Sequence, residues 1–109
     1  MARSYKVLGQ SNPTATTDTT LYTVPGSTET VVSTISICNL AATAATYRIA
    51  VRPNGVTLAN QHYITYDASL PANDTAMITV GLTLDSSDIV TVRASSGSVV
   101  FGLFGSEIS

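Results

Sequence analysis

The side chains that could carry out chemistry are few in this sequence, and they are scattered. There is one histidine, His62, and one cysteine, Cys38. A tetrahedral metal site needs three or four such ligands, so these two residues are too few to build one. His62 could serve a nucleophilic serine, but the G-x-S-x-G pattern of a nucleophile elbow is missing from the sequence. We interpret His62 as a hydrogen-bonding or interface residue, and Cys38 as a small, buried apolar residue of a strand.

Most of the acidic residues fall in segments with turn composition, where aspartate commonly accepts hydrogen bonds from nearby backbone amides. The run Asp85-Ser86-Ser87-Asp88 carries oxygen ligands for Ca²⁺, but it lacks the ligand spacing of an EF-hand loop, so we predict a plain turn. A small hydrolase that uses His62 or Asp67 stays open as a minor alternative. A paired-carboxylate site needs a deep cleft, for which a short chain has little room. We predict no enzyme activity, no catalytic residue, no metal and no cofactor.

The composition points to a surface that packs against partners. Charged residues make up 11% of the chain, whereas soluble domains carry roughly 25%. Thr and Ser replace the missing charge, with 17 and 13 copies. Thr is β-branched and suits a half-buried pleated surface. The net charge is −2 and there are only five basic residues. These are too few to neutralise the phosphates of a nucleic acid, so we expect no binding to nucleic acid.

The start of the chain and its apolar runs bear on where the protein is made. Residues 1–7 have a basic beginning without the long apolar core of a secretory signal. Apolar stretches stay below the ~20 residues that span a bilayer. We expect a protein that is made in the cytosol and does not insert into a membrane. A single cysteine also excludes an intrachain disulfide.

Short runs of β-branched and alternating residues, separated by turn residues, predict an all-β fold. Pro25-Gly26 and Asn54-Gly55 are strong turn signals. The predicted strands cover residues 5–10, 20–24, 30–38, 46–52, 62–67, 75–82, 89–94 and 99–104. Eight short strands at this spacing favour a single-domain antiparallel β-sandwich or a jelly-roll-like barrel that spans residues 1–109. Residues 1–4 could form an N-terminal arm.

Alternation along the strands predicts which side chains share a face. In the third strand Val31, Ile35 and Ile37 fall on one face and Val32 on the other. In the fourth strand Tyr47, Ile49 and Val51 are the apolar face, opposite Arg48 and Arg52. Tyr63 and Tyr66 differ in parity, which predicts one inward and one outward ring. The last strand is apolar on both faces, as in a central strand or one that a partner covers, and its glycines allow close approach of a backbone or ring.

Aromatic and arginine side chains are the strongest candidates for contacts with partners, because they combine apolar area with polar tips. Arg48 and Arg52 are either solvated or anchors for a partner's carboxylates. The first and last strands supply further apolar contacts. The candidate interface comprises Tyr5, Arg48, Arg52, His62, Tyr63, Tyr66, Phe101 and Phe104.

Several stretches of the sequence together resemble small virion structural proteins of tailed bacteriophages. The similarity is one of pattern, extends over roughly residues 20 to 108, and consists of structural motifs. These are residues 21–26 (LYTVPG), 31–35 (VVSTI) with Cys38-Asn39, 44–53 (AATYRIAVRP), 58–64 (LANQHYI), 71–75 (PANDT) and 101–108.

The resemblance implies a capsid decoration (cement) protein or a small tail or fibre component. A cement protein would bind the major capsid protein and copies of itself on the capsid surface of the virion. We expect a homo-oligomer, with a trimer favoured over a dimer, and no binding to nucleic acid or membrane. A tail or fibre component would instead bind a host surface receptor, and Tyr63, Tyr66 and His62 would contribute. The missing coiled-coil shaft favours the capsid role.

Overall fold

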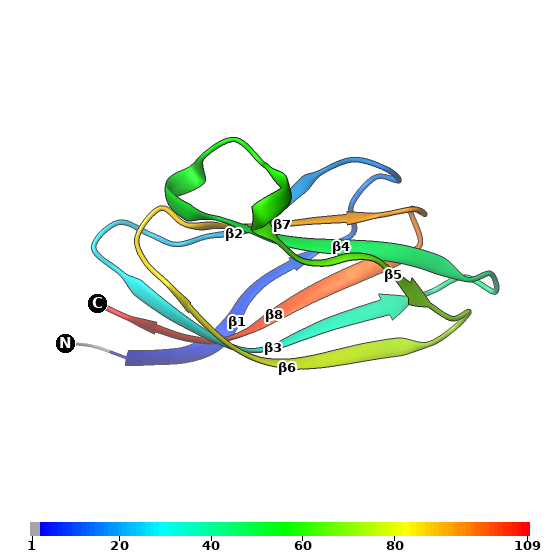
Figure 1. Cartoon of the computed structure of the whole chain (residues 1–109). Coiled ribbons are helices and arrows are strands. Elements are labelled where there is room, and N and C mark those ends of the chain that lie inside the picture. The colour runs from blue at the N-terminus through cyan, green and yellow to red at the C-terminus, as the bar shows by residue number, and fades with distance from the viewer. Residues whose placement is uncertain (1–2) are drawn as a thin grey trace.

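The protein folds into two antiparallel four-stranded sheets, as the computed structural model of the chain shows for residues 3–109 (Figure 1). All eight predicted strands are present in this range. Their bounds are β1 (Arg3–Ser11), β2 (Thr19–Thr23), β3 (Glu29–Asn39), β4 (Ala45–Arg52), β5 (Tyr63–Leu70), β6 (Thr75–Leu84), β7 (Ile89–Ala94) and β8 (Val99–Ile108). In the part of the chain that is described, no helix has the length and apolar character needed to cross a membrane.

The order of the strands is that of a jelly roll. Sheet A has the order β1-β8-β3-β6, and sheet B has the order β2-β7-β4-β5. Each sheet therefore interleaves strands from the two halves of the chain, which is the double Greek key of an eight-stranded jelly roll. Only β4 and β5 are consecutive in sequence and neighbours in one sheet. Of the two predicted architectures, the antiparallel β-sandwich is confirmed, with the strand order of a jelly roll and without closure into a barrel.

The core lies between the two sheets and is built from one face of each. Ile35 and Ile37 of β3 pack there with Ile49 of β4, and all three are fully buried. Burying side chains of this size stabilises the fold by roughly 1.5–3 kcal/mol each. The rings of Tyr47 and Phe101 meet edge to face, with centroids 6.5 Å apart, and link sheet B to sheet A. The apolar face predicted for the fourth strand is thus confirmed.

Strand β8 is central in sheet A, between β1 and β3, which confirms the prediction from its two apolar faces. Two of its glycines permit close approach. A Cβ at Gly105 would collide with the carbonyl oxygen of Val31 on β3. A Cβ at Gly102 would lie 2.7 Å from Ser36 Oγ and 3.0 Å from the ring of Phe104, which lies across it.

A β-bulge in β3 corrects the faces predicted for that strand. Val32 pairs with Gly105 and Thr34 with Phe104, so Ser33 is an extra residue without a partner on β8. The insertion reverses the alternation, and both Ser33 and Thr34 turn away from the core. Val32 is therefore buried on the same face as Ile35. Val31 was predicted to share the face of Ile35, but it is exposed. Alternation is conserved along a strand only where no bulge interrupts it.

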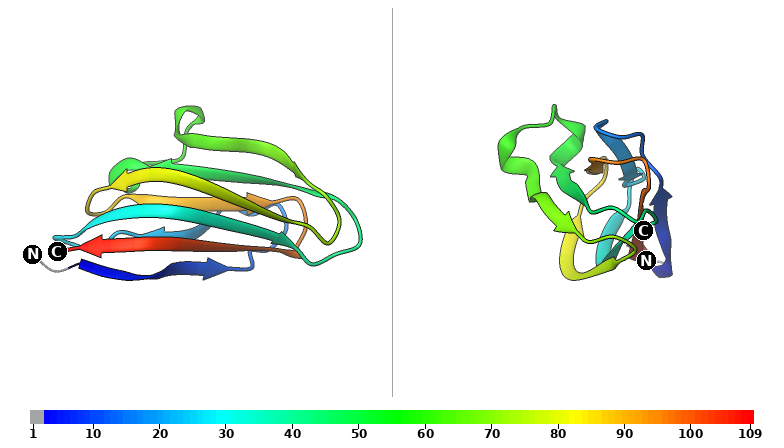
Figure 2. Two further views of the ribbon diagram at one scale, coloured as in Figure 1. Left: turned by 90° about the horizontal axis from the view of Figure 1, so that it is seen from below. Right: turned by 90° about the vertical axis from the view of Figure 1, so that its right-hand side faces the viewer.

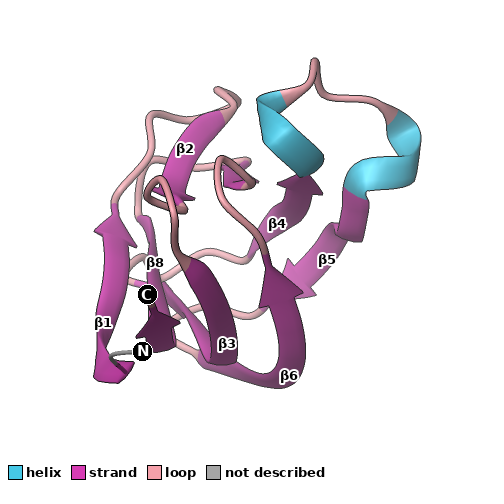
Figure 3. Cartoon of the chain, turned by 90° about the vertical axis from the view of Figure 1, so that its left-hand side faces the viewer, coloured by secondary structure: helices cyan, strands magenta, loops and turns pink. Residues whose placement is uncertain are grey.

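The segment between β4 and β5 covers part of the outer face of sheet B (Figure 3). It holds two single 3₁₀ turns, η1 (Pro53–Gly55) and η2 (Asn60–His62). Ala50 and Thr91 point to this side of the sheet and are nevertheless buried. The covered portion of sheet B is consequently closed to partners.

An N-terminal arm was predicted for residues 1–4, but Arg3 and Ser4 do not form one. Arg3 pairs with Ile108 and Ser4 with Glu107, so both belong to β1. Met1 and Ala2 lie outside the described residues.

Candidate functional site

Arg48 is the centre of a cluster on the outer face of sheet B. It donates from Nε to Asp67 Oδ1 at 2.6 Å and from an η nitrogen to Asp67 Oδ2 at 3.3 Å. Its guanidinium also lies 4.1 Å from the centre of the Tyr66 ring, within the range of a cation–π contact. Tyr66 in turn meets Tyr63 edge to face at 4.9 Å. We call Arg48, Tyr63, Tyr66 and Asp67 the β4–β5 cluster.

Two bulges in β5 assemble this cluster. Tyr47 pairs with Ala68 and Ile49 with Thr65, so both Tyr66 and Asp67 lie opposite Arg48. Asp67 takes a positive φ of 51°, a conformation that Asp tolerates better than most residues.

The bulges also overturn the parity prediction for the two tyrosines. Ile64 is a second extra residue on β5, between the pairs Ile49–Thr65 and Ala50–Tyr63. It shifts the alternation by one position, so Tyr63 and Tyr66 both face outward and their rings touch. The prediction of one inward and one outward ring is wrong because it assumed an unbroken period of two.

Two arginines lie side by side on this face, and each has an acidic neighbour. Arg48 pairs directly across strands with Arg93. Asp67 neutralises Arg48, and Asp18 lies 3.7 Å from Arg93. The hydrogen bonds from Arg48 lower the pKa of the Asp67 carboxyl, and the same bonds raise the pKa of Arg48. Both groups are therefore charged at neutral pH, and each of the two arginine–aspartate pairs is neutral as a whole.

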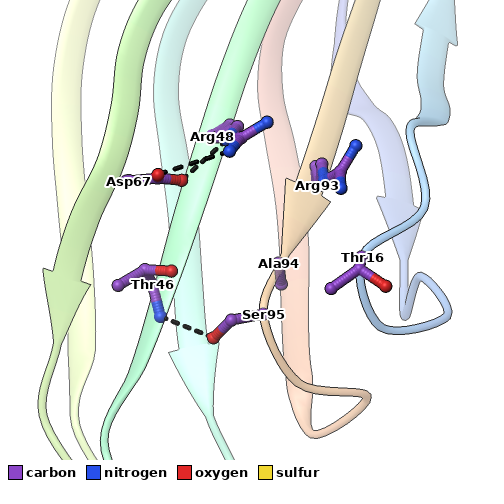
Figure 4. Close-up of a pocket in the computed structure, with 7 residues that line it drawn as sticks. All are labelled: Thr16, Thr46, Arg48, Asp67, Arg93, Ala94 and Ser95. Atoms are coloured by element: carbon purple, nitrogen blue, oxygen red, sulfur yellow. Dashed lines mark hydrogen bonds and ion pairs between the residues drawn. The ribbon is translucent and has the colours of Figure 1, made fainter.

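A small, open, polar pocket lies between these two arginines and the end of β7 (Figure 4). Thr16, Thr46 and Ser95 contribute hydroxyl groups to its lining. The Ser95 hydroxyl accepts a hydrogen bond from the amide of Thr46 at 2.9 Å. Arginine, carboxylate, hydroxyl and tyrosine groups together are suited to binding the hydroxyls of a sugar, for which the rings of the β4–β5 cluster offer a stacking surface.

His62 and Arg52, two of the predicted interface residues, bind their own chain. His62 Nδ1 accepts a hydrogen bond from the amide of Ala59 at 2.9 Å, which closes η2 and places the proton of neutral histidine on Nε2. Arg52 donates to the carbonyl oxygens of Val56 at 2.8 Å and Gly55 at 3.1 Å. Both side chains hold the segment that covers sheet B.

The acidic run 85–88 forms a turn, as predicted. Asp88 Oδ2 accepts a hydrogen bond from the amide of Asp85, and Oδ1 accepts one from the amide of Asn54. Within residues 3–109, no group of three or more His, Cys, Asp and Glu side chains is placed to hold a metal ion. Cys38 lies in the outer face of sheet A, opposite Val100 and Thr75, and is half-buried. The prediction that it is a buried residue is therefore wrong.

A second candidate surface is the outer face of sheet A, which no other segment of the described chain covers (Figure 2, left). Four large apolar side chains are exposed in its strands: Tyr5, Val7, Val31 and Met77. Phe104 lies among them over Gly102. Phe101, the remaining predicted interface residue, is buried between the sheets and does not reach this surface.

The charges on this face are confined to one end. Of the side chains that are described there, only Arg3 and Glu29 are charged, and both flank Ile108 in one row across the sheet. The rows beyond them are uncharged: one consists of Val7, Phe104, Thr34 and Thr79, and another of Gln10, Gly102, Ser36 and Met77. We call the side chains of these rows, together with Tyr5, Val31 and the charged residues Arg3 and Glu29, the sheet A face.

Sequence reasoning missed Met77, Val7 and Asp67 as members of these surfaces. Met77 could have been found from the sequence. It lies between Thr75 and Thr79 on the face of the strand that is otherwise polar, so an exposed apolar residue was to be expected there. Asp67 had none, since its position beside Arg48 depends on the bulge.

Comparisons with known proteins assign no family to the chain: no family model, no curated protein and no solved structure matches it. Its function is therefore argued from the two surfaces.

Proposed function

We propose that the protein is a non-enzymatic structural component of a bacteriophage particle, a capsid decoration protein that binds the major capsid protein shell together with copies of itself. The observation that carries this proposal is the sheet A face, a broad surface that is uncharged except at one end, with Tyr5, Val7 and Met77 exposed. Apolar area of this kind marks an interaction surface in a soluble protein. The resemblance to phage virion proteins supports the particle as the place where it is used.

The uses of the reactive side chains agree with a structural role. His62, Asp85 and Asp88 form turns, and Arg48 and Asp67 neutralise each other. Two antiparallel four-stranded sheets that share one buried core give a rigid body, which suits a clamp on a shell exposed to mechanical stress.

Stoichiometry on the particle tests the capsid role. The protein would be quantified by mass spectrometry against the major capsid protein in purified virions, and purified protein would be added to shells that lack it. We expect copy numbers in the hundreds per particle, even coverage of the head in electron micrographs, and saturable rebinding. A few copies per particle, located at the tail, would refute the proposal.

A second candidate, a tail or fibre component that binds a host surface glycan, is favoured by the β4–β5 cluster. Tyr66 is 57% exposed beside the polar pocket, and aromatic faces commonly stack on sugar rings. Glycan-array binding that is lost in Tyr66→Ala but kept in Val56→Ala, a change at another exposed apolar residue beside sheet B, would support it. Absence of binding, together with even coverage of the head, would exclude it.

A further inference from the structure

We propose that two copies of this chain pair through the sheet A face, about a two-fold axis that runs parallel to the strands between β8 and β3. The inference rests on the proposed function and deepens its self-association: it assigns the sheet A face to a second copy of the chain, in a dimer rather than the trimer that the sequence favoured. The pairing is a property of the isolated protein, so it can fail while binding to a shell succeeds, and the reverse is equally possible.

A protruding side chain and a hollow on the same row make the face self-complementary. Met77 lies on the edge strand β6 and is 63% exposed. A hollow lies near the opposite edge, lined by Gln10, Ser36, Val100 and Gly102 among others. Met77 and Gln10 end the same row across the sheet, at β6 and β1. Gly102 lies in the lining of the hollow, with the ring of Phe104 and the hydroxyl of Ser36 packed against it.

The position of the axis follows from that row. A rotation of 180° about a line parallel to the strands, midway between β8 and β3, places β1 of one copy over β6 of the other. It does not change the position along the strands, so each row of one copy lies over the same row of the other. Met77 of each copy then lies over Gln10 and the hollow of the other. A two-fold interface repeats every contact, so one protrusion and one hollow per copy fill both sites. Methionine is well suited to such a site because its flexible chain fits irregular gaps.

The two charges on the face select the same axis. Arg3 on β1 and Glu29 on β3 lie at the same level. After the rotation, Glu29 of the second copy lies over β8, one strand spacing of about 4.8 Å from Arg3. Two Arg3–Glu29 ion pairs therefore form. An axis perpendicular to the strands would place both charges over the uncharged end around Val100 and Cys38, where they would be buried without a partner.

The strands of sheet A run along the length of the body, which measures 45 × 28 × 19 Å (Figure 2, left). Stable complexes bury roughly 800 Å² on each partner, so we expect the pairing to engage all four strands of the sheet. Aligned sheets also pack face to face at about 10 Å with their strands within about 30°, which the parallel axis allows.

The mass of the purified full chain in solution tests the pairing first. By light scattering at micromolar concentration we expect twice the chain mass of 11.3 kDa. Met77→Asp should shift the protein to monomer by weakening the dimer about thirtyfold or more. Ile64→Asp is the matched control, because Ile64 is an exposed apolar residue of β5 in sheet B, and it should remain dimeric. Circular dichroism would confirm that both variants are folded.

Two further variants test the orientation. Arg3→Glu and Glu29→Arg should each weaken the dimer, and the double exchange should restore it. In a Cys38→Ser background, Gln10→Cys with Met77→Cys should be joined between copies by a thiol-specific cross-linker that spans the spacing of about 10 Å between packed sheets. Within one chain these positions are three strand spacings apart, about 14 Å, which is beyond the reach of that cross-linker. A monomer, a trimer, a dimer unaffected by Met77→Asp, or failure of both the charge exchange and the cross-link would overturn the proposal.

Discussion

Tyr22 of β2 and Glu107 of β8 are joined by a hydrogen bond that connects sheet B to sheet A. The phenol of Tyr22 donates to Glu107 Oε2 at 2.5 Å. Because its proton is committed there, the hydroxyl of Thr30, 2.8 Å away, donates to the phenol oxygen. Lys6 of β1 pairs with the other oxygen of Glu107 at 2.5 Å. These four side chains therefore tie β1, β2, β3 and β8 together at one end of the sandwich.

The first prediction concerns alkaline stability. Burial and the hydrogen bond to Glu107 raise the pKa of Tyr22 to about 12, against about 10 in the unfolded chain. The folded state holds this proton more tightly, so the contribution of Tyr22 to stability is complete below about pH 10 and is lost as the pH rises through about 12. Urea unfolding should show this decline in the wild type. In Tyr22→Phe the corresponding part of the pH dependence should be absent, and an unchanged decline would refute the assignment.

The second prediction concerns acid. Hydrogen bonds from Lys6 and Tyr22 lower the pKa of the Glu107 carboxyl. The unfolded chain binds this proton more readily, so the stabilisation is present above the unfolded pKa of about 4.3 and is lost as the pH falls through the folded value. Glu107→Gln should be less stable than the wild type at neutral pH and should lose less stability on acidification. A Glu107→Gln variant that keeps both the stability and the acid dependence of the wild type would contradict the assignment.

The contact between Tyr22 and Glu107 could not be predicted from the sequence, although the strands that carry it could. Alternation and turn residues are local signals, and they located all eight strands to within a few residues. The hydrogen bond joins positions 85 residues apart, and it depends on the order in which the strands pair. Many strand orders satisfy the same local pattern, so the jelly roll was only one of the possible arrangements.

The errors in side-chain direction have one physical cause. Extra residues at Ser33 and Ile64 shift the alternation by one, which exposed Val31 and brought Tyr63 onto the same face as Tyr66. A bulge is a property of the paired strands, because it exists only where the partner strand lacks the matching residue. Arg48, Tyr63 and Tyr66 of the β4–β5 cluster were therefore foreseen as candidate interface residues, whereas Asp67 and the geometry of the cluster were not.

The third prediction tests the close approach of β8 to β3. A Cβ at Gly105 would collide with the carbonyl oxygen of Val31, a backbone atom that cannot move without breaking the ladder. Gly105→Ala should destabilise the protein by about 2 kcal/mol or more, measured by urea unfolding. Gly97→Ala is the matched control, since a Cβ at Gly97 meets no described atom within 4 Å. Equal stability of the two variants would show that β8 and β3 are not in such close contact.

The fourth prediction concerns Asn39, a buried polar side chain that organises three loops. It is 1% exposed and donates to the carbonyl oxygens of Thr43 at 2.8 Å and Pro71 at 3.2 Å. Its Oδ1 accepts from the amide of Ala41 at 3.0 Å and from the hydroxyl of Ser98 at 3.2 Å. The β3–β4, β5–β6 and β7–β8 connections are thus held by one side chain.

Asn39→Ala should leave these loop groups without their partner and cost about 2–4 kcal/mol of unfolding free energy, because buried polar groups that lose a hydrogen bond pay their desolvation. Hydrogen exchange should quicken at the amides of Ala41 and Asn73, which belong to two of these loops. Asn60→Ala, at an exposed asparagine of η2, should change stability by less than about 0.5 kcal/mol. If Asn39→Ala is as stable as Asn60→Ala, the loops are held by their own backbone hydrogen bonds, such as that from the amide of Asn73 to the carbonyl of Ala41.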